Sequence, residues 1–346
     1  MRFTLYPIQW LADEVDGHPF DKRQLPFDIF QGVRIEDVSQ RFLKGTFDLF
    51  KARLGEEIIQ KLERVRYALV HRYKPETTFV NGEFFGEVEQ AQASENLIRR
   101  VAACLRLIRP MRQSALFMAG SIRDDGTFDV PRFDSPPLHL IEVPDVQTLF
   151  MLRDCDAADL KTYTPEFIRA MGGQFWKFRM AIQFHELGHF QALDWKARYI
   201  MWCSAIESIY TSHAWEHKGS VVAKARIKWF LGENTSIYAP GDISDLLTDP
   251  HITVGQILDD LYEMRNFLAH GDRLDDRFFT DYPRSGFQGQ VQRWEVLTEA
   301  ASFIIRTSLL KILRDGLLHH FADAGPAEAF FATQGLTRKM LTTKRP

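Results

Sequence analysis

Two short stretches of the chain combine residue types at spacings that could do chemistry. FHELGHF holds two histidines one helical turn apart, His185 and His189, with the carboxylate of Glu186 beside the first. LYEMRNFLAHGDRL holds an arginine and a histidine five positions apart, Arg265 and His270. The first pattern favours hydrolysis at a bound metal ion, and the second favours metal-free chemistry at a phosphodiester.

The first stretch contains the His-Glu-x-x-His pattern of many zinc peptidases. Histidines at i and i+4 lie on one face of a helix, where both can bind one Zn²⁺ while the intervening glutamate activates a water. A zinc site here would use His185 and His189 as ligands and Glu186 as the base. Glu207, 18 positions after His189, is the best-placed third ligand. The alternative is a plain bundle helix on which two histidines share a face.

The second stretch lies at the end of a predicted helix, VGQILDDLYEMRNFLAH. Thr253 and Gln256 form a capping box at its start, and Gly271 is a natural stop after its last residue. An apolar seam along the helix predicts that one face packs against other helices. The seam consists of Ile257, Leu261, Met264 and Leu268.

The polar residues at the end of this helix could cleave a phosphodiester. Asn266 and His270 are one turn apart, so the amide can orient the imidazole. The negative helix terminus favours the imidazolium. An arginine that binds phosphate, beside a histidine that gives or takes a proton, needs no metal for this chemistry. The alternative is that cationic side chains simply suit the helix dipole.

These residues resemble a known family. RNFLAH fits the Arg-x(4–6)-His signature of HEPN domains, with a polar residue, Asn266, directly after the arginine. The longer LYEMRNFLAHG resembles the corresponding helix of the ApeA-like HEPN subgroup. So does the upstream helix RYIMWCSAIESIY, with its small-apolar-Glu step. The resemblance covers roughly residues 164–320.

The resemblance implies a fold, an activity and a partner. HEPN domains are helical bundles that usually dimerise, and many are metal-independent endoribonucleases of toxin–antitoxin, anti-phage defence or RNA-processing systems. Others are inactive binding modules. For this chain, the resemblance implies RNA as the substrate, no cofactor and no DNA specificity. It also implies a homodimer with a composite active site. Carried over by position, Arg265 and His270 are the catalytic pair and Asn266 supports them.

Glu207 distinguishes the two hypotheses. On a helical projection it falls beside Cys203, at the edge of an aromatic stripe, where a carboxylate is costly unless paired. We expect Arg265 to be its partner, whereas the zinc hypothesis makes Glu207 a ligand. Glu207 and Tyr262 are the two supporting residues that we expect beside the catalytic pair.

Basic residues follow the predicted site. Arg273, Arg277 and Arg284 could guide a phosphate backbone. Their segment, DRLDDRFFTDYPRSG, is also acidic, and a solvated surface explains the arginines equally well.

The composition is that of a soluble globular protein. Of 346 residues, 45% are hydrophobic and 26% are charged, and the net charge of −3 gives no global positive field. The three cysteines match no disulfide or zinc framework, which favours a reducing cytoplasm. MRFTLYPIQWLADEV does not resemble a secretory signal, and no apolar run approaches the roughly 20 residues of a membrane helix.

The predicted fold class is α+β, in three parts. Residues 1–150 form a mixed α/β module, residues 160–325 a HEPN-like all-α bundle, and residues 326–346 a tail. β-Prone runs before residue 150 alternate with helical segments at about 55–71 and 95–108. The β-prone runs are RFTLYPIQW, ETTFVNGEFF, SALFMAG and LHLIEV, and DDGTFDVPRFDSPP is expected to be a loop or a strand edge.

Helices dominate after residue 160. Thr164 as N-cap and Pro165 as first helical residue predict a helix that runs to about Phe190. A second helix carries an aromatic stripe that includes Tyr199 and Trp202. Further helices are predicted over about 221–231, over the capping-box stretch, and over about 292–319.

Overall fold

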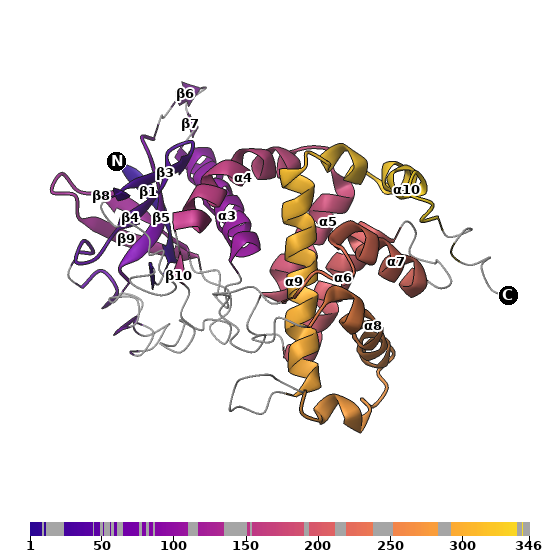
Figure 1. Ribbon diagram of the computed structural model, residues 1–346. Helices are drawn as coiled ribbons and strands as arrows, with labels where there is room; N and C mark the ends of the chain where they lie inside the picture. Colours follow the sequence, from indigo (N-terminus) through magenta and orange to yellow (C-terminus); the bar gives the residue numbers. More distant parts are fainter. Residues whose placement is uncertain are drawn as a thin grey trace. The chain divides into compact units, whose positions relative to one another are not determined.

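A computed structural model describes most of the chain, in two compact units. One unit comprises Met1–Ile168 with Phe190–Ala192, and the other Arg169–His189 with Leu193–Pro346 (Figure 1). The described residues are 1–8, 10–11, 24–43, 45–48, 51, 56, 59–60, 65–75, 78–80, 83–85, 87–109, 117–134, 151–152, 154–189, 194–211, 219–237, 252–282, 292–337 and 341.

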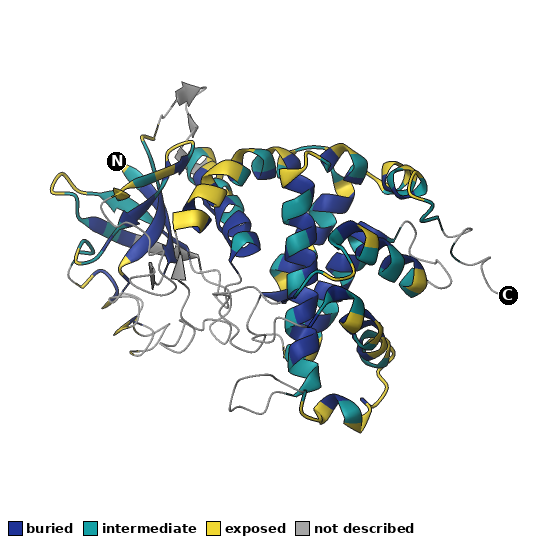
Figure 2. Ribbon diagram, viewed as in Figure 1, coloured by how far each residue is buried: buried dark blue, intermediate teal, exposed yellow. Residues whose placement is uncertain are grey.

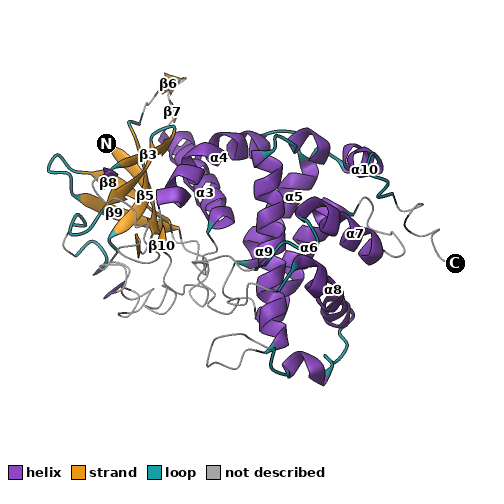
Figure 3. Cartoon of the chain, in the orientation of Figure 1, coloured by secondary structure: helices purple, strands orange, loops and turns teal. Residues whose placement is uncertain are grey.

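The first unit is built on an antiparallel sheet, whose strands are orange in Figure 3. The sheet has six strands in the order β3-β4-β5-β1-β8-β9. Helix α3, Glu87–Ile108, packs against β1 and β5. The sheet strands are β1 (Arg2–Ile8), β3 (Phe27–Phe30), β4 (Val33–Asp37), β5 (Tyr67–Tyr73), β8 (Phe117–Ile122) and β9 (Phe128–Asp134). Two small pairs accompany it: β2 (Trp10–Leu11) with β10 (Met151–Leu152), and β6 (Thr78–Val80) with β7 (Glu83–Phe85).

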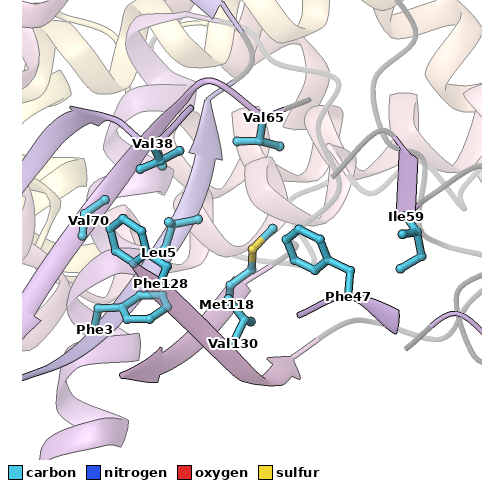
Figure 4. Packing of buried hydrophobic residues seen from close by; sticks show 11 residues of the cluster. Phe3, Leu5, Val38, Phe47, Ile59, Val65, Val70, Met118, Phe128 and Val130 are labelled. Atoms are coloured by element: carbon cyan, nitrogen blue, oxygen red, sulfur yellow. The ribbon is translucent and has the colours of Figure 1, made fainter. Parts of the chain in front are cut away.

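Both faces of the central strand β1 are covered. Leu5 lies opposite Val70 of β5 and Met118 of β8, and the three belong to one buried cluster (Figure 4). On the other face, the Tyr6 hydroxyl accepts a hydrogen bond of 2.8 Å from Arg106 of α3. A strand buried on both faces is apolar along most of its length, as RFTLYPI is.

The predictions for this unit are confirmed in part. Strands form in RFTLYPIQW, ETTFVNGEFF and SALFMAG, and DDGTFDVPRFDSPP contains the edge strand β9. An edge position suits Pro131, which has no N–H for a further strand. The helix predicted over 55–71 is wrong at its end, because residues 67–73 form β5 between β4 and β1. LHLIEV lies outside the described residues.

The second unit is helical in the part that the structure describes. Helix α6 packs against α5, α7, α8 and α9. Long buried faces run along α6 and α9 (Figure 2). The helices are α5 (Trp176–Gly188), α6 (Trp195–Tyr210), α7 (Gly219–Leu231), α8 (Val254–His270), α9 (Arg293–Arg314) and α10 (Ala324–Ala332), with 3-10 turns η5 (Asp276–Phe279) and η6 (Leu318–Phe321).

The helix predicted to start at Thr164 begins ten residues earlier. Helix α4, Asp154–Gly172, starts in the first unit, ends in the second, and includes Pro165 in its interior. A new helix then begins at Trp176, so the prediction of one helix to about Phe190 is wrong. The first turn of α4 contains two aspartates, which suit a helix N-terminus. Asp156 of this turn also pairs with Arg109 at 2.7 Å, a buried contact between residues 47 positions apart. This longer-range interaction stabilises a helix start that the Thr164–Pro165 pattern does not predict.

Helix α8 matches its predicted bounds. The Thr253–Gln256 capping box is formed in both directions, and Gly271 ends the helix with φ 74°, a left-handed conformation that favours glycine. These local interactions determine where the last turn, and therefore His270, is placed. None of the described helices combines the length and the hydropathy needed to cross a bilayer.

Candidate functional site

Helices α6 and α8 bring the predicted supporting residue Glu207 next to the predicted catalytic residue Arg265. The hydroxyl of Tyr199 on α6 donates a hydrogen bond to the carbonyl of Leu261 on α8, and both residues are buried. The aromatic stripe predicted on α6, which includes Tyr199 and Trp202, is buried as expected. The buried contact holds the two helices side by side one turn before Arg265.

Glu207 pairs with Arg265, as the sequence predicts. The Arg265 Nη2 donates to the Glu207 Oε2 at 2.9 Å, and the two side chains are 29% and 27% exposed. A half-exposed pair of this kind contributes about 1 kcal/mol or less to stability. Its main consequence is geometric, because one oxygen of the carboxylate holds one edge of the guanidinium.

Asn266 holds the same guanidinium from a second side. The Arg265 Nη1 donates to the Asn266 Oδ1 at 3.3 Å. The predicted contact between Asn266 and His270 is not present: among the described residues, the imidazole of His270 makes no hydrogen bond. His270 lies exposed in the last turn of α8. The amide therefore orients the arginine and not the histidine.

A buried hydroxyl and a buried thiol lie close enough to this pair to interact with its charges. Tyr262 and Cys203 are buried, and burial raises the pKa of both groups, with the negative charge of Glu207 adding to the shift. The hydroxyl of Tyr262 has no hydrogen-bond partner among the described residues. Both groups therefore stay protonated at neutral pH.

The structure describes two of the three arginines that were predicted to guide a phosphate backbone. Arg273 is exposed and pairs with Asp276 at 3.4 Å. Arg277 forms an ion pair with Glu263, and their hydrogen bond raises the pKa of the arginine. Arg284 lies outside the described residues. Acidic partners thus engage both of the described arginines, as on a solvated surface.

The two histidines of FHELGHF are buried and in contact. Their Nε2 atoms lie 3.1 Å apart, and the Glu186 carboxylate is 3.5 Å from the Nδ1 of His185. The third ligand of the zinc hypothesis, Glu207, points instead to Arg265. Across the described ranges, no group of three or more His, Cys, Asp or Glu side chains could hold a metal ion.

Trp202 gives this stretch a packing role that the sequence did not reveal. Its indole N–H donates to the His185 carbonyl at 3.3 Å, and its ring meets the His189 ring edge-on at 5.4 Å. A Cβ on Gly188 would lie 2.3 Å from the indole nitrogen. Because Gly188 has no side chain, the Trp202 ring of α6 can pack directly against α5.

A cavity of about 480 Å³ beside Glu207 was also not predicted. The pattern that could have revealed it is a polar row along the second half of α6, at i, i+3, i+4 and i+7: Ser204, Glu207, Ser208 and Thr211. Helix α5 and the start of α10 complete the cavity. They contribute Trp176, Lys177, Met180, Phe184, Asp323 and Ala324.

Comparison of the chain with protein-family models, with curated proteins and with solved structures finds no match. Any assignment of activity therefore depends on side chains and their geometry. The arrangement on α6 and α8 consists of an arginine held on two sides and an exposed histidine one turn further along. It offers a cation for an anionic group and a group that transfers protons.

Proposed function

We propose that the chain is a metal-independent endoribonuclease of the HEPN type, with its helical unit as the HEPN bundle. The observation that carries the proposal is the pairing of Glu207 with Arg265, predicted from the sequence and present at 2.9 Å. A carboxylate that orients an arginine suits a site that binds phosphate, because the remaining N–H groups keep a defined direction.

The proposed reaction is an internal transesterification of RNA. The ribose 2′-oxygen attacks the adjacent phosphorus, the bond from phosphorus to the 5′-oxygen breaks, and the products carry a 2′,3′-cyclic phosphate and a 5′-hydroxyl. His270 takes the proton of the 2′-hydroxyl or gives one to the leaving 5′-oxygen. Arg265 stabilises the charge that develops on the phosphate oxygens. Glu207 and Asn266 keep the guanidinium in place.

A dimer completes the proposed site. One His270 can perform one of the two proton transfers, and a second copy of the chain would supply a second histidine for the other. The exposed position of His270 at the end of α8 supports this arrangement, because the imidazole lies where another chain can reach it. The site is then formed by both protomers, with RNA between them.

Incubation of the purified chain with RNA tests the proposal. We expect cleavage that continues in EDTA and yields fragments with 2′,3′-cyclic phosphate ends, detected by mass spectrometry. Arg265→Ala should reduce the rate by about 100-fold or more. Arg314→Ala, at an exposed arginine of α9 that also forms an ion pair of 2.9 Å, is the matched control that retains it. Absence of cleavage, or equal cleavage by the Arg265 variant, overturns the proposal. RNA that binds without being cut favours the inactive binding module.

One observation favours a second candidate function, the zinc metallopeptidase. The Nε2 atoms of His185 and His189 lie 3.1 Å apart. This distance suits two imidazoles that bind the same zinc ion, each at about 2 Å. The same distance also suits an N–H of one ring that donates to the other nitrogen. Elemental analysis separates the two: the peptidase requires about one zinc per chain, lost in His189→Ala.

A further inference from the structure

The cavity beside Glu207 lies within the helical unit, between α5, α6 and the start of α10. Its volume of about 480 Å³ is in the range of small-ligand sites and could hold one nucleotide. Glu207 belongs both to the cavity lining and to the pair with Arg265. A group bound against Glu207 there would act directly on the residue that positions the proposed catalytic arginine.

The α6 wall of the cavity consists of hydrogen-bond acceptors. The hydroxyls of Ser204, Ser208 and Thr211 each donate to the carbonyl one turn earlier, at 2.9, 2.8 and 2.6 Å. Their hydrogens are thus used, and their oxygens present lone pairs. Glu207 adds a carboxylate, of which one oxygen binds Arg265. A ligand that fits this wall must bring N–H groups.

The α5 side of the lining is mostly aromatic and apolar. Trp176, Met180 and Phe184 of α5 form it, and the Trp176 side chain is 57% exposed, unusual for so large an apolar ring. An exposed indole at the edge of a cavity is suited to stack on a flat ring. The two walls together fit a planar ligand whose edge carries donors.

The charge of the lining disfavours a phosphate in the cavity itself. Two carboxylates, Glu207 and Asp323, accompany one ammonium, Lys177. The lysine is buried and donates to the carbonyl of Thr211. Asp323 caps α10 by accepting from the N–H of Ala324 at 2.7 Å, so it occupies the anion-attracting end of that helix. A neutral ring suits this cavity better than an anion does.

We infer that the cavity holds one nucleobase of the substrate, and that the base is guanine; the inference rests on the proposed ribonuclease function. Guanine is the base that has two neighbouring donors, N1–H and N2–H, on its pairing edge. Adenine and cytosine carry one amino group beside a ring acceptor, and uracil has one N–H between two carbonyls. A carboxylate backed by hydroxyl oxygens is therefore best matched by guanine, stacked on Trp176.

The proposed subsite would also couple recognition to cleavage. A guanine edge on Glu207 restricts the carboxylate, and the carboxylate restricts Arg265 through the bond of 2.9 Å. A different base leaves Glu207 and the guanidinium less well oriented. We therefore expect cleavage of guanine-containing sites to be favoured in kcat as well as in KM.

Equilibrium dialysis of the full chain against mononucleotides tests the subsite without requiring cleavage. Guanosine monophosphate should bind at least about tenfold more tightly than the adenosine, cytidine or uridine monophosphates. Trp176→Ala should weaken that binding about tenfold, and Trp176→Phe should restore most of it. Trp229→Ala, at another exposed tryptophan (41%) that does not line the cavity, is the matched control. Equal binding of all four, or no effect of Trp176→Ala, overturns the inference.

Cleavage of matched oligonucleotides separates this inference from the proposed function. Each unstructured RNA contains one guanosine or, at the same position, another nucleoside. The parent should cut the guanosine RNA preferentially, and Trp176→Ala should lose the preference while still folding, because its side chain is largely exposed. Cleavage without base preference overturns the subsite and leaves the nuclease standing. Absence of cleavage of every RNA overturns the nuclease, whatever the dialysis shows.

Discussion

FHELGHF and RNFLAH are both short helical stretches with two chemistry-bearing side chains, yet their surroundings differ. In the first, His185 and His189 are buried, touch each other, and pack against Trp202. In the second, Arg265 is half exposed between two polar partners, and His270 is exposed at the helix end. Residue types alone therefore do not make a site: accessibility and partners decide what the side chains can do.

One histidine from each stretch, His270 and His189, should respond in opposite ways to removal. His270→Ala should lower RNA cleavage by about 100-fold or more, because it removes a proton-transfer group, and should leave the melting temperature almost unchanged. His189→Ala should retain cleavage within about threefold but lower the free energy of unfolding by about 1–3 kcal/mol. Cleavage rates and thermal melts of both variants check this. Loss of activity in His189→Ala, together with lost zinc, would reverse the assignment.

Gly188→Ala should break the packing of the first stretch. A Cβ there would lie 2.3 Å from the Trp202 indole, so helix α5 or the ring must move, at a cost of about 1–3 kcal/mol. The measurement is chemical denaturation. Gly325→Ala, where an added Cβ meets nothing within 4 Å, is the matched control. Equal stability of both variants would show that Gly188 has no packing role.

Glu207→Gln should test the second stretch through its positioning residue. The amide keeps the size but loses the charge, so the hold on Arg265 weakens and we expect about tenfold slower cleavage. In an Arg265→Lys background the same change should have a smaller effect, since the paired geometry is already lost. If Glu207→Gln only damaged the fold, it would slow cleavage by the same factor in the parent and in the Arg265→Lys variant. The melting temperature would then fall as well.

Tyr262→Phe should have the smallest effect at neutral pH. Its hydroxyl has no described partner, so its removal should change the free energy of unfolding by less than about 1 kcal/mol. Because burial raises the pKa of the folded tyrosine above its usual value of 10.0, ionisation favours the unfolded chain as the pH rises beyond that value. The variant should therefore lose less stability between about pH 9 and 11. Identical pH profiles would show that Tyr262 does not contribute to alkaline unfolding.

Local sequence patterns predicted the parts of the fold that local interactions determine. The capping box at Thr253 and the left-handed Gly271 defined α8 from end to end. The failures lie where longer-range packing prevails. Residues 67–71 were predicted helical but pair between two strands, and Thr164 with Pro165 looked like a helix start but lies inside α4.

The candidate site was predictable to a similar extent. Cys203 and the aromatic stripe of α6 indicated that the Glu207 carboxylate needs a partner, and the requirement to compensate a half-buried charge pointed to Arg265. The orientation of Asn266 was not predictable, because an amide one turn before a histidine and next to an arginine can serve either.

The ends of α8 and the buried face of α6 follow from the local sequence, because capping and periodicity depend on few neighbours. The pairing of Glu207 with Arg265 could be predicted as charge compensation, although it joins two helices at positions 58 residues apart. Tertiary structure decided what lies against each motif. Only the packing of α6 on α5 buried His185 and His189 against Trp202 and opened the cavity beside Glu207. The reason is that accessibility belongs to contacts between helices far apart in the chain, which no single stretch encodes.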